Sequence, residues 1–487
     1  MLFNSYIFIF LFLPLVLVGY YGLNYLKLNR LSMVFLVGMS LWFYGYNNIY
    51  YLFILVGSVF INYLLSLGLH KSKAVSTRKL LLWLGVIINI GILFYFKYMD
   101  FFIENVNSVL EKEYTLLHIV LPLGISFYTF QQVSFIIDCY KKECDQYSLL
   151  EYATYVTFFP QLIAGPIVYH SELIPQFKEE KNHRLNYENL SKGIYAFARG
   201  LGKKVLIADT LSKVVTIGYG NIGALNSVSA FVVMVCYALQ IYFDFSGYCD
   251  MAYGIGYMFN VKLPVNFNSP YKAESMGDFW DRWHMTLTRF FTRYIYIPLG
   301  GSRRGTVRTY INVLIVFLIS GFWHGAAWTF VVWGVINGIG VAIDRAIGKY
   351  WKKLPVIIKC ATTFILQIFA WSLFRAASFS EAKALWTQLF SGGSGSIYEP
   401  ITTMFNGLTE SRALSRVGLG GIINAYPWLL VVIFILILLI VCFFLKNTQE
   451  KVEDMKYTGV RLGCVVLLMT WSIISLSEIS EFLYFIF

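Results

Sequence analysis

The feature of the sequence that most restricts its fold is a long apolar run with a histidine near its middle. Residues 310–343 carry no formal charge and are mostly aliphatic, aromatic or glycine. His324 lies inside this run, in Ser320-Gly-Phe-Trp-His-Gly-Ala-Ala-Trp328. An ionisable group at the depth of a bilayer is costly and usually faces protein or a water-filled cavity. His324 is therefore a candidate functional residue.

Apolar runs recur along the whole chain. Hydrophobic residues make up 57% of the 487 residues and charged residues only 14%. A β-barrel would show short alternating segments instead of continuous runs. We therefore predict an all-α polytopic membrane protein with roughly 11 transmembrane helices, each of about 20 residues, plus re-entrant and interfacial helices. The predicted spans are residues 6–26, 31–45, 50–69, 80–96, 116–137, 194–217, 228–258, 356–374, 428–445 and 460–474, with a further pair inside 310–343.

Two of the apolar segments are not simple spans. Phe159-Pro-Gln-Leu-Ile-Ala-Gly-Pro166 contains two prolines and a glycine, which predicts a re-entrant or broken helix shielded by protein. The 310–343 run has basic residues beyond both ends, at Arg308 and Arg345. It is predicted to form a helical hairpin or two half-spans that enter and leave the membrane on the same side.

The charge pattern predicts the orientation. The basic loop at residues 70–79 is expected in the cytoplasm, and the acidic segment 100–113 outside. Counting spans places both termini and residues 376–425 outside. We treat residues 1–487 as a single integral-membrane domain, with 116–345 as its motif-bearing catalytic core. The net charge of +12 fits this topology and does not indicate a nucleic-acid partner.

Cysteine and histidine spacing does not indicate a metal. The seven cysteines are scattered without a Cys-x-x-Cys pair, so neither a disulfide framework nor a zinc site is predicted. A second histidine, His284, lies in Asp278-Phe-Trp-Asp-Arg-Trp-His-Met-Thr-Leu287. A metal shared by His284 and His324 would lack a third ligand, since the other histidines lie in distant loops or at span ends.

The residues around the two histidines allow more than one interpretation. Trp323 and Trp328 would wall a pocket or tunnel, in which a neutral imidazole at His324 can accept a proton from a hydroxyl group. A structural histidine in a helix bundle, or a solvated interfacial His284, remains an alternative. Asp244 and Ser246, in the apolar run 240–251, would form either a structural network or a substrate contact. No nucleophile elbow, Walker loop or dinucleotide fingerprint occurs.

Several motifs together carry a family resemblance. They lie, in order, at residues 121–131, 158–167, 243–248, 266–272, 283–284, 296–301, 321–325 and 481–487. Among them are Leu121-Pro-Leu-Gly-Ile-Ser-Phe-Tyr-Thr-Phe-Gln131 and Gly321-Phe-Trp-His-Gly325. The chain resembles the membrane-bound O-acyltransferase family, in its bacterial branch that O-acetylates exported polysaccharides, the alginate O-acetyltransferase membrane-subunit type.

The resemblance implies helices around a central tunnel in a bacterial cell membrane. It implies that His324 is catalytic and His284 is the second active-site histidine. The acyl donor would be cytoplasmic acetyl-CoA, a substrate and not a permanently bound cofactor. Its phosphates would be attracted by the Lys203-Lys204 pair and by the arginines between residues 282 and 308. The acceptor would be an extracytoplasmic hydroxyl of a polysaccharide, reached directly or through an SGNH-like acetyltransferase partner.

Three other functions remain open on the sequence. D-alanyl transfer to teichoic acid from a carrier protein is the nearest alternative within the enzyme class. A transporter would also contain broken helices and intramembrane polar groups, although the sequence shows no repeated halves. A non-catalytic scaffold of a secretion complex is the third.

Overall fold

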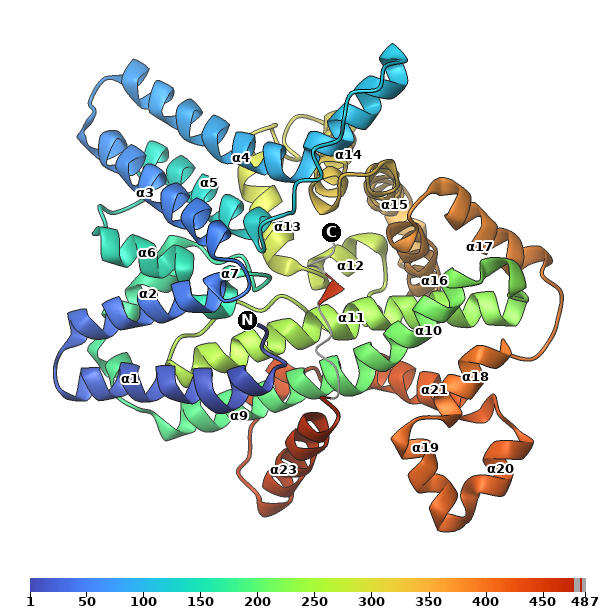
Figure 1. Cartoon of the computed structure of the whole chain (residues 1–487). Coiled ribbons are helices and arrows are strands. Elements are labelled where there is room, and N and C mark those ends of the chain that lie inside the picture. The colour runs from blue at the N-terminus through green and yellow to red at the C-terminus, as the bar shows by residue number, and fades with distance from the viewer. Residues whose placement is uncertain (477–481, 484–487) are drawn as a thin grey trace.

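The computed structural model describes residues 1–476, 482 and 483. Within that part the chain is helical, and its one extended pairing is an isolated bridge between Phe267 and Trp283. The N-terminal helices lie together at the left and top of Figure 1. They are α1 (Leu13–Tyr25), α2 (Asn29–Gly45), α3 (Ile49–Lys71), α4 (Val75–Leu110) and α5 (Ile125–Lys141). Helix α4 runs past the predicted end of its span because no proline or glycine lies between residues 97 and 110.

Helix α11 (Ser227–Met258) is the most enclosed of the candidate spans, with 89% of its apolar window buried. It packs against α9 (Tyr187–Gly202), which continues through a π-helical turn into α10 (Asp209–Gly220). A Cβ on Gly193 would lie 2.6 Å from the Gly254 carbonyl oxygen, and one on Gly200 would lie 2.5 Å from that of Gly247. These contacts repeat every seven residues in opposite directions, so the two helices approach closely and antiparallel.

The proline-containing segment is broken, as predicted. Helix α6 (Leu149–Thr157) is followed by the single turn α7 (Phe159–Leu162), a non-helical stretch and then α8 (His170–Lys178). Every residue from 154 to 170 is buried. The irregular backbone is therefore shielded by protein, which is the condition for such a break at membrane depth.

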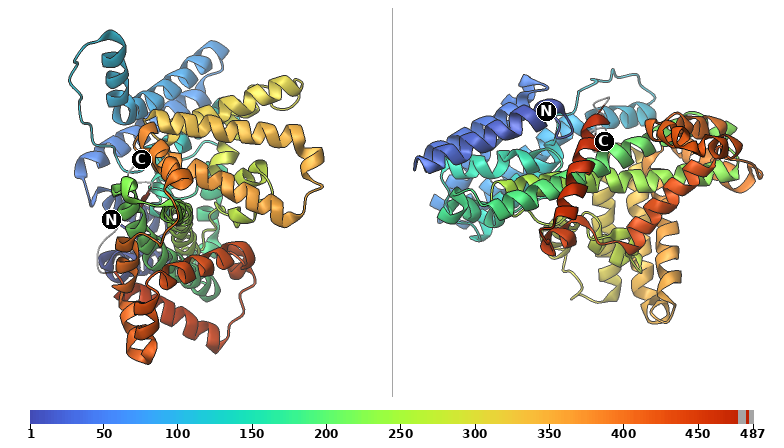
Figure 2. Two further views of the ribbon diagram at one scale, coloured as in Figure 1. Left: turned by 90° about the vertical axis from the view of Figure 1, so that its right-hand side faces the viewer. Right: turned by 90° about the horizontal axis from the view of Figure 1, so that it is seen from below.

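The 310–343 run forms the predicted hairpin. Its two helices, α14 (Thr306–His324) and α15 (Trp328–Trp351), are separated by three non-helical residues and followed by α16 (Val356–Arg375). These helices are seen close to end-on in Figure 1 and lengthwise in Figure 2, so they run across the direction of α9 and α11. Two short helices, α12 (Met276–Arg282) and α13 (Met285–Phe291), precede them.

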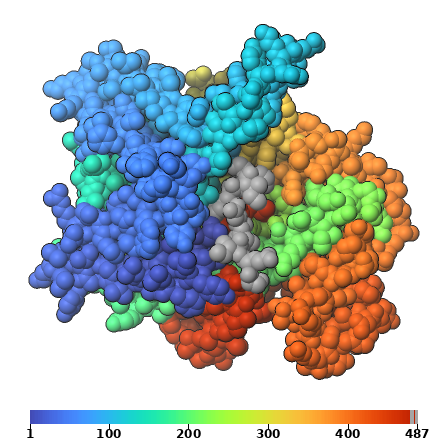
Figure 3. Space-filling model, in the orientation of Figure 1, coloured from blue at the N-terminus to red at the C-terminus, as the bar shows by residue number. Residues whose placement is uncertain are grey.

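The remaining helices follow the hairpin. They are α17 (Phe379–Ser391), α18 (Glu399–Asn406), α19 (Thr409–Leu414), α20 (Gly420–Ala425), α21 (Leu429–Phe444), α22 (Thr448–Glu453) and α23 (Gly459–Ile474). Figures 1 and 3 show α19 and α20 projecting from the body at the lower right.

Seven helices in the described residues are long and apolar enough to cross a membrane, or eight if 409–425 and α21, bent by 103°, form one span. Other predicted spans overlap shorter helices: α2 and α5 have 17 residues, α23 has 16 and α10 has 12. The predicted bounds were wrong for two of them, because residues 116–124 are not helical and 194–217 is shared by α9, the π-helical turn and α10. The polytopic all-α membrane protein predicted from the sequence is therefore confirmed.

Candidate active site

His324 is the last residue of α14 and is 3% exposed. Its ring meets Trp333 edge-on at 5.0 Å between centroids and Phe374 at 5.4 Å. The helix ends here because Gly325 is extended, and the Phe330 ring occupies the position that a Cβ on Gly325 would need. His324 therefore lies in the protein interior and does not face lipid.

Lys97, from α4, holds the end of the His324 helix. Its Nζ donates to the carbonyl oxygens of Trp323 at 2.7 Å and His324 at 3.0 Å. The last carbonyls of a helix have no partner within the helix and carry partial negative charge, so an ammonium group is favourable there. The sequence analysis missed Lys97, which follows the predicted span 80–96 by one residue.

His284 directly precedes a helix, whereas His324 ends one. His284 lies in the left-handed region at φ 46°, directly before α13, and its Nδ1 is 3.1 Å from Asn266 Oδ1. That oxygen also accepts from the backbone N–H and the hydroxyl of Thr286. An oxygen acceptor places the imidazole proton on Nδ1 and leaves the Nε2 lone pair as the basic site. Burial lowers the pKa of His284 to about 3, so the ring is neutral at physiological pH.

The indole of Trp323 lies between the two histidines. Its ring centroid is 4.9 Å from that of His324 and 6.1 Å from that of His284. Phe127 contacts Trp323 at 5.6 Å and His284 at 6.3 Å. Two histidines that are forty residues apart in sequence are therefore brought to one aromatic cluster.

A pocket of about 30 Å³ opens beside His324. It is lined by Lys97, residues 121–127, Ile163, Trp323 and His324. Three of the motifs that carry the resemblance, those at 121–131, 158–167 and 321–325, therefore meet at one site.

The other predicted tunnel residues do not line this pocket. Trp328 is 54% exposed, and its Nε1 donates to Asn105 Oδ1 at 2.9 Å. Asp244 accepts from Lys204 Nζ at 2.8 Å and from the Leu483 backbone at 2.9 Å. Ser246 lies 3.3 Å from Lys203 Nζ. Of the C-terminal motif 481–487, only residues 482 and 483 fall within the described part of the chain.

Most of the basic residues expected to attract donor phosphates are engaged in ion pairs within the chain. Lys203 pairs with Asp250 at 2.6 Å, and Lys204 with both Asp244 and Asp209. The further pairs are Arg282 with Asp278, Arg289 with Glu172, and Arg293 with Glu143 and Asp138. Arg303, Arg304 and Arg308 are exposed and form no ion pair with the described carboxylates.

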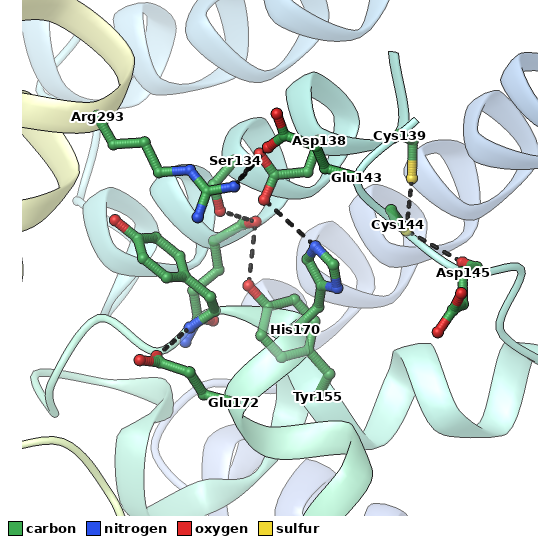
Figure 4. Close-up of polar contacts among 12 residues, drawn as sticks. Ser134, Asp138, Cys139, Glu143, Cys144, Asp145, Tyr155, His170, Glu172 and Arg293 are labelled. Atoms are coloured by element: carbon green, nitrogen blue, oxygen red, sulfur yellow. Dashed lines mark hydrogen bonds and ion pairs between the residues drawn. The ribbon is translucent and has the colours of Figure 1, made fainter. Parts of the chain in front are cut away.

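A second buried polar network surrounds Asp138, which is 1% exposed (Figure 4). Its carboxylate accepts from Tyr294 Oη at 2.9 Å, and His170 Nε2 lies 3.3 Å away. His170 in turn contacts Tyr147 Oη through Nδ1 at 3.1 Å. None of these residues lines the His324 pocket. The network joins α5, α8 and the turn after α13, which is a structural role.

Comparisons with known proteins identify the family of the chain. Residues 140–379 match the model of the membrane-bound O-acyltransferase family. The peptidoglycan O-acetyltransferase of Helicobacter pylori is 39% identical over 100% of this chain and 98% of its own length. The probable alginate O-acetylase AlgI of Pseudomonas aeruginosa is 37% identical over 82% of this chain and 76% of its own length.

A less similar relative is named for the transfer of a different acyl group. The teichoic acid D-alanyltransferase of Bacillus subtilis is 25% identical over 50% of this chain and 64% of its own length. A relative matched along nearly its whole length and the family model together establish the identity: the chain belongs to the membrane-bound O-acyltransferase family and is a multi-pass O-acyltransferase of a bacterial membrane.

Proposed function

We propose that this enzyme transfers an acetyl group from cytoplasmic acetyl-CoA to a hydroxyl group outside the membrane, for O-acetylation of a cell-surface polysaccharide such as peptidoglycan. One observation carries the proposal: the rings of His324 and His284 both contact the indole of Trp323. A pocket lined by Lys97, Trp323 and His324 lies beside them. The full-length similarity to an O-acetyltransferase supports acetyl over D-alanyl as the transferred group.

The reaction moves one proton and exchanges one bond. His324 accepts the proton of the acceptor hydroxyl, whose oxygen attacks the thioester carbonyl. The C–S bond breaks as the C–O bond forms, and the proton passes to the leaving thiolate of CoA. His284, neutral and oriented by Asn266, assists at the carbonyl or the departing sulfur. The acceptor is the polysaccharide itself or a hydroxyl side chain of an extracytoplasmic SGNH-like acetyltransferase partner.

The exposed arginines 303, 304 and 308 attract the phosphates of the donor. Arg303 and Arg304 lie in the loop before α14, the helix that ends at His324, and Arg308 lies in the first turn of that helix. The other basic residues expected to attract these phosphates are Lys203, Lys204, Arg282, Arg289 and Arg293, and all five are paired with carboxylates. The three exposed arginines therefore remain as the positive group for the donor.

The test is transfer of a radiolabelled acetyl group from acetyl-CoA in proteoliposomes containing the purified protein, with peptidoglycan fragments and a candidate partner added. His324→Ala should abolish transfer, and His284→Ala should lower it by about 100-fold or more, the size of a general acid–base contribution. His118→Ala, at an exposed loop histidine, is the matched control. Full acetyl transfer by His324→Ala would reject the mechanism.

A further inference from the structure

Outside the active site the structure brings together one imidazole and two thiols that the sequence spacing does not connect. His70 lies in the last turn of α3, Cys139 near the end of α5, and Cys144 in the loop that follows. One ligand atom from each lies within 4.8 Å of the other two. We propose that His70, Cys139 and Cys144 form a binding site for zinc.

The atoms that face the site are those that a metal would use. His70 Nε2 is buried and makes no hydrogen bond within the described part of the chain. The backbone of Asp145 hydrogen-bonds the same imidazole, so Nε2 is the ring nitrogen that remains for a metal. A metal-ligating histidine typically gives its other ring nitrogen to a carbonyl or carboxylate, which fixes the orientation of the ring.

The two sulfurs are a reduced pair in contact. Cys139 Sγ and Cys144 Sγ are 2.9 Å apart, beyond the length of a disulfide bond at about 2.05 Å. Figure 4 shows Cys144 between Cys139 and Asp145. Two thiolates on tetrahedral zinc lie about 3.8 Å apart, because each Zn–S bond is about 2.3 Å. Cys144 is half-buried and lies in the loop after α5, so a rotation of its side chain to that separation would not move a helix.

A buried cation lies beside the two thiols. Arg78 is 7% exposed, and its guanidinium donates to the carbonyl oxygens of Leu69 and Cys139. Contact with the Cys144 thiol and burial raise the pKa of the Cys139 thiol, and Arg78 opposes that rise. A bound zinc ion would itself deprotonate the coordinating thiols. The contacts of Arg78 fix the end of α3 against the end of α5, so the ligands are held together before any metal arrives.

The ligand set selects the metal. Two thiolates and an imidazole suit zinc better than magnesium or calcium, which prefer oxygen. Three protein ligands leave a fourth position of the tetrahedron for water or another group. The site lies beside the basic loop 70–79, on the side predicted to be cytoplasmic, where a reducing environment keeps cysteines as thiols. The assignment is independent of the acyl-transfer proposal.

The first experiment measures metal in the full-length protein purified in detergent without chelators. Elemental analysis should find about one zinc per chain in the wild type, as for one three-ligand site. Cys139→Ser/Cys144→Ser and His70→Gln should each lose most of it. Cys464→Ser, which removes an exposed thiol from α23, should retain it. Zinc that is absent from the wild type, or unchanged in the double variant, would overturn the site.

The second experiment needs no variant and covers the case in which the substitutions prevent folding. Chelator-treated wild-type protein is titrated with Co²⁺, and the expected result is a thiolate-to-cobalt charge-transfer band that saturates at one equivalent. Added Zn²⁺ should abolish the band. Alkylation of Cys139 and Cys144 under non-reducing conditions can contradict the proposal. If the two residues resist alkylation until a reductant is added, they form a disulfide, and the zinc site is wrong.

Discussion

Lys97 connects α4 to the end of the helix that carries His324. Its ammonium group bonds the last two carbonyls of α14, so Lys97→Met should leave those carbonyls unpaired and free the helix end. Hydrogen bonds to a charged group contribute about 1.5–3 kcal/mol, so we expect acetyl transfer to fall by about 10- to 100-fold. The measurement is initial rate in proteoliposomes at matched protein content.

The control for Lys97→Met lies on the same helix. Lys79→Met removes an exposed lysine at the other end of α4 and should retain wild-type rate. Equal rates for Lys97→Met and the wild type would show that Lys97 does not position His324. Partial recovery with Lys97→Arg, which keeps the charge, would support the proposed contact.

Individual residues also show where sequence reasoning reached its limit. His324 could be predicted because an ionisable group inside a charge-free run is costly unless protein surrounds it. Lys97 could not, because a lysine just beyond an apolar run is also what a span end contains. Asp244 and Ser246 were recognised as buried polar residues, yet their lysine partners lie 40 and 43 residues upstream, and only the packing of α9–α11 reveals them.

At the scale of helices, the α14–α15 hairpin depends on glycines at its closest contact. A Cβ on Gly321 would lie 2.4 Å from the Phe330 carbonyl oxygen and 3.1 Å from the Gly334 Cα. Backbone atoms cannot rotate away, so Gly321→Ala should separate the helices three residues from His324. We expect a loss of about 1–3 kcal/mol in stability, measured as a lower melting temperature in detergent, together with reduced transfer.

Gly348→Ala is the matched control for Gly321→Ala. Gly348 lies on α15 with nothing within 4 Å of the added Cβ. Alanine is a better helix former than glycine, so this variant should be neutral or slightly more stable. A similar melting temperature for Gly321→Ala and Gly348→Ala would contradict the close approach of the two helices.

The arginine loop, which comprises residues 302–308 and includes the first turn of α14, makes a separate prediction. Arg303→Gln/Arg304→Gln/Arg308→Gln should raise the KM for acetyl-CoA by about tenfold at low salt, since each exposed ion pair contributes up to about 1 kcal/mol. The effect should shrink as ionic strength rises, and kcat should change little. Lys349→Gln/Lys352→Gln/Lys353→Gln is the control, because it removes as much exposed charge from the last turn of α15 and the residues after it. A fall in kcat with unchanged KM would exclude a donor-binding role.

For the whole molecule, the motifs predicted the family better than hydropathy predicted the number of spans. The broken helix at 159–166 and the hairpin at 310–343 were both recognisable, from prolines in one case and flanking arginines in the other. The number of spans was harder to predict because helices such as α5 and α10 are buried against other helices and need not be 20 residues long. Their polar residues, including Asp138, are satisfied by neighbours that hydropathy cannot identify.

The orientation of the molecule in the membrane can be tested, because the proposed donor and acceptor must reach the two histidines from opposite sides. The arginine loop is expected in the cytoplasm and the glycine-rich turn after α17 outside. In a Cys464→Ser background, Ser394→Cys should react with a membrane-impermeant maleimide in spheroplasts, and Ser302→Cys should react only after permeabilisation. Both serines are exposed in the structure, so a difference in labelling reports the side of the membrane. Labelling of Ser302→Cys in sealed spheroplasts would place the arginine loop outside, where it could not collect a cytoplasmic thioester, and the direction of acyl transfer would have to be reversed.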